Sequence, residues 1–84
     1  MIPIQELLSR IRWDVDFGKA DFHIGYLDRI QQRIVRVPLK EIAFVDDDPF
    51  AFQFCDLEGE THSVPLHRIK AVYRNGDLIW HREH

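Results

Sequence analysis

The chain has 84 residues, enough for one domain with a small hydrophobic core. Its ordinary apolar content excludes a disordered chain, and its single cysteine, Cys55, excludes an intrachain disulfide and a zinc site built from several cysteines. A formal net charge of -3 argues against general binding of duplex DNA, where neutralisation of phosphates dominates affinity. No apolar run reaches membrane-spanning length and no signal peptide is recognisable, so we expect a cytoplasmic protein without a membrane partner.

Charge is distributed unevenly along the chain. Residues 19–40 carry five basic and two acidic side chains, whereas residues 41–60 carry seven acidic side chains and no basic ones. Residues 61–84 return to four basic and two acidic side chains. A local basic pocket is therefore compatible with the acidic total, because the distribution of charge matters more than its sum.

The first element predicted by the sequence is an amphipathic helix over residues 3–12. Its apolar residues follow the spacing i, i+3, i+4, i+7, which places them on one helix face: Ile4, Leu7, Leu8 and Ile11. Pro3 suits the first turn, where its missing N–H costs nothing. We expect this helix to cover a sheet, and residues 13–18 to form an irregular connection.

From residue 21 the pattern indicates β-structure to about residue 82. Phe22, Ile24 and Tyr26 alternate with other residues, which is typical of a strand with one buried face. Further short strands are predicted at 33–37, 42–45, 50–55 and 61–64. An acidic turn at 46–49 separates two of them, and Pro49 is expected to end pairing there.

The last predicted element is a tight hairpin. Asn75-Gly76 lies between two apolar runs, residues 71–73 and 78–80. Asn-Gly in this setting is the strongest short-range hairpin signal, because a type I′ turn requires positive φ at both central residues.

Two six-residue segments, 37–42 and 64–69, share the pattern Val-Pro-Leu-x-x-Ile. We interpret each as a strand, one turn of 3₁₀ or α-helix begun by proline, and a second strand, with Leu and Ile buried. The variable pair is Lys40-Glu41 in the first segment and His67-Arg68 in the second. The arginine offers a planar fork of donors that suits phosphate, and histidine can donate a hydrogen bond near neutral pH.

These elements predict one α+β domain over residues 1–84. We expect the N-terminal helix to pack on a curled antiparallel sheet of about six or seven short strands, approaching a small barrel. The motifs also resemble a family of small microbial proteins, the RNA cyclic group end recognition domain. The resembling segments run almost end to end: residues 4–8, 11–14, 25–26, 28–29, 65–69 and 80–82.

The resemblance implies a non-catalytic module that binds RNA termini bearing a cyclic phosphate, in association with RNA repair or processing enzymes. It points to Asp28, Arg29, His67 and Arg68 as the RNA- and phosphate-binding residues. Tyr26 and Trp80 are expected to stack a base or to support the site. The same residues also admit structural interpretations, as turn pairs, ion pairs with the acidic segment, and core aromatics.

Two other functions stay open at the level of sequence. A protein-interaction module without nucleic-acid binding would use the acidic segment 41–60 for a basic partner, or an exposed face of Phe50, Phe52 and Phe54 for an apolar one. A phosphoesterase would need two histidines, or a histidine with a lysine or glutamate, converging on one phosphate, which spacing cannot establish. We expect neither a metal ion nor another cofactor, because the Asp46–Asp48 run lacks the glycine and distal glutamate of a calcium loop.

Overall fold

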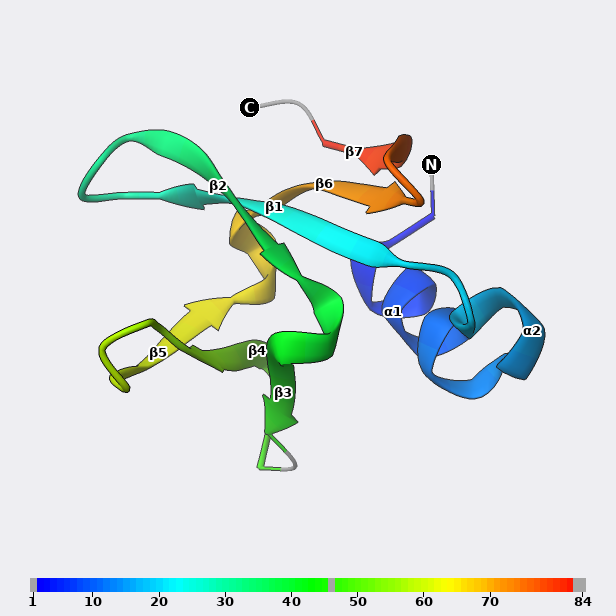
Figure 1. The fold of residues 1–84 in the computed structure, drawn as a ribbon, viewed down its shortest axis with the longest axis horizontal. Helices are drawn as coiled ribbons and strands as arrows, with labels where there is room; N and C mark the ends of the chain where they lie inside the picture. Colours follow the sequence, from blue (N-terminus) through cyan, green and yellow to red (C-terminus); the bar gives the residue numbers. More distant parts are fainter. Residues whose placement is uncertain (1, 46, 83–84) are drawn as a thin grey trace.

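The computed structural model describes residues 2–45 and 47–82. Within these residues it has two helices, α1 (Ile4–Trp13) and α2 (Val15–Gly18), and seven strands in two antiparallel sheets (Figure 1). Sheet A has the order β2-β1-β6-β7, formed by β1 (Phe22–Asp28), β2 (Arg33–Pro38), β6 (Ile69–Arg74) and β7 (Asp77–His81). Sheet B has the order β3-β4-β5, formed by β3 (Ile42–Val45), β4 (Asp48–Cys55) and β5 (Thr61–Pro65). No helix in the described ranges is long and apolar enough to span a bilayer.

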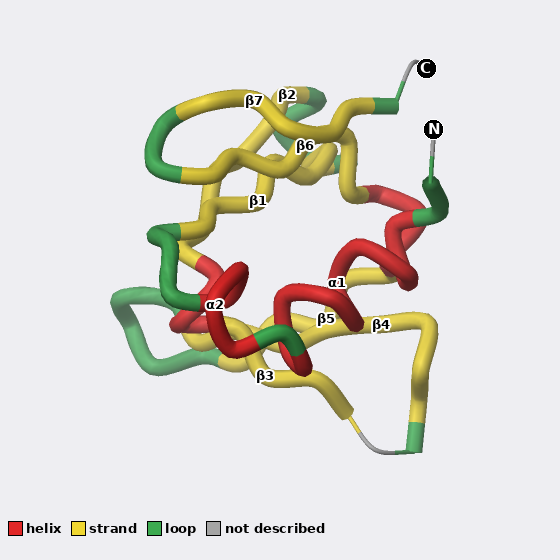
Figure 2. Tube along the Cα trace, turned by 90° about the vertical axis from the view of Figure 1, so that its right-hand side faces the viewer, coloured by secondary structure: helices red, strands yellow, loops and turns green. Residues whose placement is uncertain are grey.

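Helix α1 forms as its spacing predicts. Its four apolar residues, Ile4, Leu7, Leu8 and Ile11, are all buried, and they belong to one core cluster with residues of both sheets. Figure 2 shows α1 between sheet A above and sheet B below. The helix therefore fills one opening of the space between the sheets, and burial of its apolar stripe is what holds it there.

The expectation of an irregular connection at residues 13–18 is wrong, because a short helix, α2, forms within it. The Asp14 side chain caps this helix by accepting a hydrogen bond of 3.1 Å from the backbone N–H of Phe17. At its end Gly18 passes very close to α1, where an added Cβ would lie 2.5 Å from the carbonyl oxygen of Ile11. Only glycine permits that approach.

The single curled sheet of the sequence prediction is also wrong. The two Val-Pro-Leu-x-x-Ile segments form 3₁₀ turns, η1 (Leu39–Glu41) and η2 (Leu66–Arg68). The first carries the chain from β2 of sheet A to β3 of sheet B, and the second carries it back from β5 to β6. Each repeat is therefore a corner between sheets, and the seven strands divide into two open sheets.

Burial differs between the two corners. Leu66 and Ile69 are buried at η2, whereas the equivalent Leu39 and Ile42 at η1 are only partly buried and pack at the edge of the core. In both turns the N–H of the isoleucine donates to the carbonyl of the leucine. The interpretation of each segment as strand, 3₁₀ turn and strand is thus correct. The predicted burial of leucine and isoleucine is complete only in the second segment, 64–69.

Strand β4 departs from the predicted alternation at its beginning. Asp48 pairs with Val45, but the next pair is Phe52 with Phe44, so the register shifts and part of β4 bulges out of the ladder with β3. Pairing therefore includes one step before Pro49, which corrects the expectation that it ends there. The bulge leaves Phe50 66% exposed, whereas Phe52 is fully buried.

The C-terminal hairpin follows the sequence prediction. Asn75 and Gly76 have φ of 51° and 88°, as a type I′ turn requires. Asn75 also fastens the turn to the start of β1, because its Oδ1 accepts from the Asp21 N–H and its own N–H donates to the Asp21 carbonyl, at 2.9 Å and 2.7 Å. This bracing helps to keep sheet A in register.

Candidate functional site

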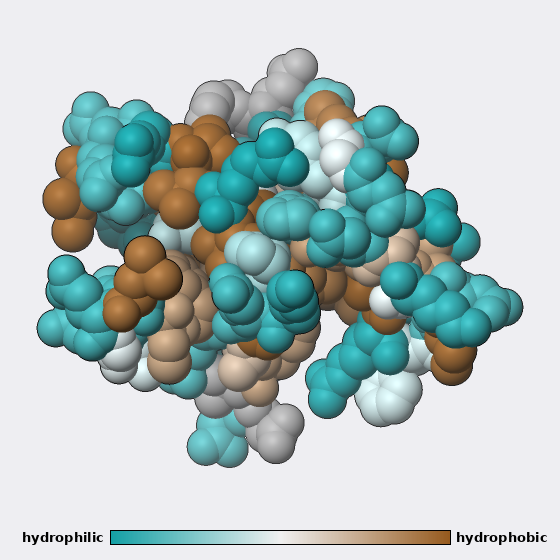
Figure 3. Space-filling view, in the orientation of Figure 1, coloured by the Kyte–Doolittle hydropathy of each residue, from teal (hydrophilic) through white to brown (hydrophobic). Residues whose placement is uncertain are grey.

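The space between the sheets is open on the side opposite α1. The β1–β2 hairpin and the β4–β5 turn both project on that side of the molecule (Figure 1). A cleft of about 500 Å³ lies between them, and we call it the arginine cleft. Figure 3 shows hydrophilic and apolar surface side by side at this edge, so the cleft offers both kinds of contact.

The lining of the arginine cleft combines polar and apolar side chains. Its charged and polar side chains are Asp28, Arg29, Gln31, Arg33, Asp56, His62, Ser63 and Arg68. Its apolar and aromatic side chains are Tyr26, Ile30, Val35, Phe54 and Val64. The volume falls within the range of pockets that take whole small molecules, about 300–1,000 Å³.

Three arginines from two elements converge here. Arg29 and Arg33 belong to the β1–β2 hairpin, and Arg68 ends η2. Within the described ranges, no carboxylate oxygen lies within 4.0 Å of a nitrogen of these guanidinium groups. Their charge is thus not neutralised by direct ion pairs with described residues, and the arrangement favours an anion with several oxygens, such as a phosphate.

In both turns at the cleft, the β1–β2 turn and the β4–β5 turn, one aspartate oxygen accepts hydrogen bonds from two backbone N–H groups. The Asp28 Oδ1 accepts from the backbone N–H groups of Ile30 and Gln31, at 2.9 Å and 3.2 Å. These bonds close the turn that carries Arg29. Asp28 therefore positions Arg29 through the backbone of the turn, and no direct ion pair between the two side chains is required.

The Asp56 side chain closes the β4–β5 turn. Its Oδ1 accepts from the N–H groups of Glu58 and Glu60, at 2.9 Å and 3.0 Å, and its Oδ2 lies 2.7 Å from the His62 Nε2. Because an ionised carboxylate only accepts, the Nε2–H of His62 is the donor. The turn and the imidazole are thus held by one carboxylate.

Four of the six residues singled out from sequence line the arginine cleft: Tyr26, Asp28, Arg29 and Arg68. The prediction that they bind RNA stays a prediction. Tyr26 is buried, with its ring against those of Phe52 and Phe54 at centroid distances of 6.0 Å and 5.8 Å. Burial and then the nearby Asp28 charge raise the pKa of the Tyr26 phenol, so it stays a neutral donor.

The other two residues lie elsewhere. The His67 side chain is exposed and is not part of the cleft lining, while its carbonyl accepts from Arg82 Nη1 at 2.9 Å. Trp80 is 5% exposed, and its Nε1–H donates to the carbonyl of Ile2 at 2.8 Å. Burial gives Trp80, like Tyr26, a supporting role in the core and leaves it no open face for a base.

Two residues that line the cleft were not predicted as site residues from the sequence: Arg33 and His62. Arg33 pairs with Asp28 across the β1–β2 hairpin, so the hairpin assignment itself could have indicated that it lies beside Arg29. His62 pairs with Phe54 in sheet B. Its position could not be read from spacing, because it depends on which sheet faces the β1–β2 hairpin.

The Asp56–His62 hydrogen bond predicts a pH dependence of stability. That bond, followed by the backbone bonds to Asp56, lowers the pKa of its carboxyl below the ordinary value of 3.8. A depressed pKa adds stability above the unfolded pKa, and this stability is lost as pH falls through the lower folded pKa. We therefore expect urea midpoints to fall between about pH 5 and pH 2.5 by more in the wild type than in Asp56→Asn. Equal falls in both proteins would contradict this role of Asp56.

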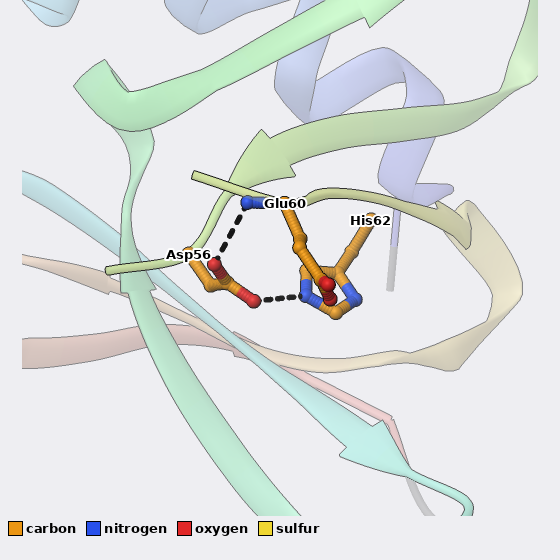
Figure 4. A group of neighbouring side chains, drawn as sticks. All are labelled: Asp56, Glu60 and His62. Carbon is orange, nitrogen blue, oxygen red and sulfur yellow. Dashed lines mark hydrogen bonds and ion pairs between the residues drawn. The ribbon is translucent and has the colours of Figure 1, made fainter. Parts of the chain in front are cut away.

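Asp56, Glu60 and His62 also form the one group of potential metal ligands found in the described part of the chain (Figure 4). One ligand atom from each residue lies within 4.8 Å of the others. Two carboxylates and an imidazole could hold a divalent cation. However, the Asp56 Oδ1 already accepts the two bonds that build the turn and its Oδ2 accepts from His62, so existing contacts account for the positions of Asp56 and His62 without an ion.

A second, smaller cavity of about 250 Å³ lies between α1 and the β3–β4 hairpin. Trp13, 72% exposed, stands at its edge with the Arg12 guanidinium 5.1 Å from its ring centroid. One arginine and one aspartate, Arg12 and Asp48, line this cavity, so its charges are balanced. The arginine cleft differs in having an excess of positive charge, with three arginines against two aspartates in its lining.

The fold and the cleft define a class of protein, a small two-sheet α+β domain whose strand ends and turns gather arginines around a ligand-sized cleft. Comparison with known proteins specifies the family. Residues 1–82 match the MJ1316 RNA cyclic group end recognition domain, and the chain belongs to this family. It is 32% identical over 83 residues to the UPF0248 protein SSO2687 of Saccharolobus solfataricus, covering 96% of this chain and 98% of that protein. No solved structure matches the chain significantly.

Proposed function

We propose that this chain is a non-catalytic domain that recognises RNA 3′ ends carrying a phosphate, in particular a 2′,3′-cyclic phosphate. The observation that carries the proposal is the convergence of Arg29, Arg33 and Arg68 on one cleft without a direct carboxylate partner among the described residues. A site of this kind suits one terminal phosphate better than a long backbone, because the chain as a whole has a net charge of -3. The family description supports the same ligand.

In this proposal Arg29 and Arg68 hold the phosphate oxygens from two sides and Arg33 adds a third guanidinium. Asp28 acts by shaping the turn that presents Arg29. His67 would donate a hydrogen bond to a phosphate or ribose oxygen, which requires its side chain to turn toward the cleft, because it is not part of the cleft lining. The domain would act in the cytoplasm beside RNA repair or processing enzymes.

Recognition accounts for the cleft better than hydrolysis does. General acid–base cleavage of a cyclic phosphate would use two proton-transfer groups at one phosphorus. Among the described histidines, His62 is the one that lines the arginine cleft, while His23, His67 and His81 lie on other elements. The lining also contains no lysine or glutamate, so neither pair that the phosphoesterase alternative would use is assembled among the described residues of the cleft.

The protein-interaction alternative needs an exposed aromatic face on β4. Phe52 is instead fully buried in the core that includes α1, and Phe54 is half-buried against it, which leaves Phe50 alone exposed. The β4 face therefore gives this alternative little support.

The proposal predicts discrimination between RNA ends. We expect short RNAs of one sequence to bind in the order cyclic phosphate, open phosphate, hydroxyl, with the hydroxyl end at least tenfold weaker than the cyclic end, because it loses the charge-assisted bonds. The measurement is a fluorescence titration at low and physiological salt. Equal, weak binding of all three RNAs would refute end recognition, and a pull-down for a protein partner would then be the next step.

A further inference from the structure

Three successively stacked rings lie between the core and the arginine cleft. Phe52, fully buried, stacks with Phe54 at a centroid distance of 6.4 Å and an interplanar angle of 28°. Phe54 in turn stacks with His62 at 5.2 Å and 23°. Phe54 and His62 both line the cleft, so this aromatic series ends at the ligand side of the molecule.

His62 lies at the open end of the series. It sits on β5, an edge strand of sheet B, directly opposite Phe54 on β4. Among the residues that the structure describes, no further strand of this sheet follows beyond β5, and the His62 side chain is 46% exposed. Phe54 covers one side of the His62 ring. On the other side, beyond the sheet edge, no described strand of sheet B supplies a further ring.

The ring of His62 is also held in place before any ligand arrives. Its Nε2 donates to Asp56, which is itself fixed by two backbone N–H groups of the turn. A ring fixed on one side by Phe54 and at its edge by Asp56 loses little further freedom on binding. This preorganisation is what an efficient stacking platform requires.

The arginine cleft is larger than a phosphate group alone would fill. Its volume of about 500 Å³ suits a ligand of nucleotide size, and its lining includes aromatic and apolar side chains besides the arginines. Unpaired RNA bases are commonly recognised by stacking on aromatic or histidine rings. Tyr26 and Trp80, the aromatics expected to stack from the sequence, are 8% and 5% exposed and are committed to the core.

We infer that His62 is the stacking platform for the terminal nucleobase of the bound RNA, with Phe54 behind it. This inference rests on the proposed function and adds a nucleoside subsite to the phosphate site. The terminal nucleotide then bridges the two sheets, with its phosphate on the arginines and its base on the imidazole of β5.

The test compares two RNAs that both end in a 2′,3′-cyclic phosphate. One has a normal terminal nucleoside and the other has a 1-deoxyribose spacer without a base at that position. We expect the wild type to bind the base-bearing RNA about tenfold more tightly, within the range known for base stacking. His62→Phe, which retains a flat ring, is expected to keep this preference, and His62→Ala is expected to lose it.

His81→Ala is the matched control, because His81 is exposed on β7 and is not part of the cleft lining. Circular dichroism melts of all variants check that the fold is retained. A wild type that binds both RNAs equally overturns this inference and leaves the proposed function intact, whereas a wild type that binds neither overturns both. Loss of the preference in His62→Phe as well as in His62→Ala shows a polar role of His62 and overturns stacking.

Discussion

Arg68→Ala is expected to weaken binding of cyclic-phosphate RNA by at least tenfold while the domain stays folded. A hydrogen bond to a charged group contributes about 1.5–3 kcal/mol, and Arg68 would make such bonds directly with the terminal phosphate. The side chain is partly exposed and has no carboxylate within 4.0 Å among the described residues, so its removal breaks no ion pair with them. A fluorescence titration measures the affinity, and circular dichroism measures the melting temperature.

The chain contains a matched control for this variant. Lys40 lies in η1, the equivalent 3₁₀ turn of the first repeat, and it is exposed and absent from the cleft lining. Lys40→Ala removes one positive charge, as Arg68→Ala does. Because Lys40 lies outside the cleft, this variant should leave the preference for the cyclic end unchanged. Arg68→Lys should fall between Arg68→Ala and wild type, because the charge remains but the planar fork is lost.

Salt dependence separates a phosphate contact from a general loss of fold. If Arg68 contacts a phosphate, Arg68→Ala should reduce the slope of log affinity against log salt by about one unit or less. If the circular dichroism melt instead shows that Arg68→Ala unfolds the domain, Arg68 is structural and the assignment of the site is wrong.

Phe52→Ala is expected to have the largest effect on stability. Its ring is fully buried, packs edge-on against Tyr26 and stacks at an angle of 28° with Phe54. Truncation of a buried phenylalanine costs about 3–5 kcal/mol, which is a large share of the total stability of a small domain. Urea denaturation followed by circular dichroism should show a partly or wholly unfolded variant at 37 °C.

Phe50→Ala provides the comparison within the same strand. Phe50 is 66% exposed because the β4 bulge takes it out of the ladder, so its truncation should change the free energy of unfolding by about 0.5 kcal/mol or less. Similar costs for the two substitutions would contradict the observed register of β4.

Prediction of the candidate site from sequence was partial. Asp28, Arg29 and Arg68 lie in the same cleft, although they come from a hairpin and a corner turn that are distant in the chain. His67, the sequence neighbour of Arg68, does not line the cleft, because adjacent residues in a 3₁₀ turn point in different directions. His62 was missed as a site residue because its position depends on the pairing of β5 with β4.

The local elements were determined by the sequence itself. The apolar stripe of α1, the Asn75-Gly76 turn and the proline-led 3₁₀ turns each depend on residues a few positions apart, whose backbone preferences act whatever the rest of the chain does. The alternation in β1 likewise predicted the buried face of Phe22, Ile24 and Tyr26.

The division into two sheets was decided only by the tertiary structure. Alternation tells which face of a strand is buried but not which strand lies beside it, and β1 pairs with β6 across more than half of the chain. The two corner turns could equally have continued one curled sheet. Helix α1 packs into one opening between the sheets. The opposite side stays open, and there the arginines of the β1–β2 hairpin and of η2 line the same cleft as His62 of β5.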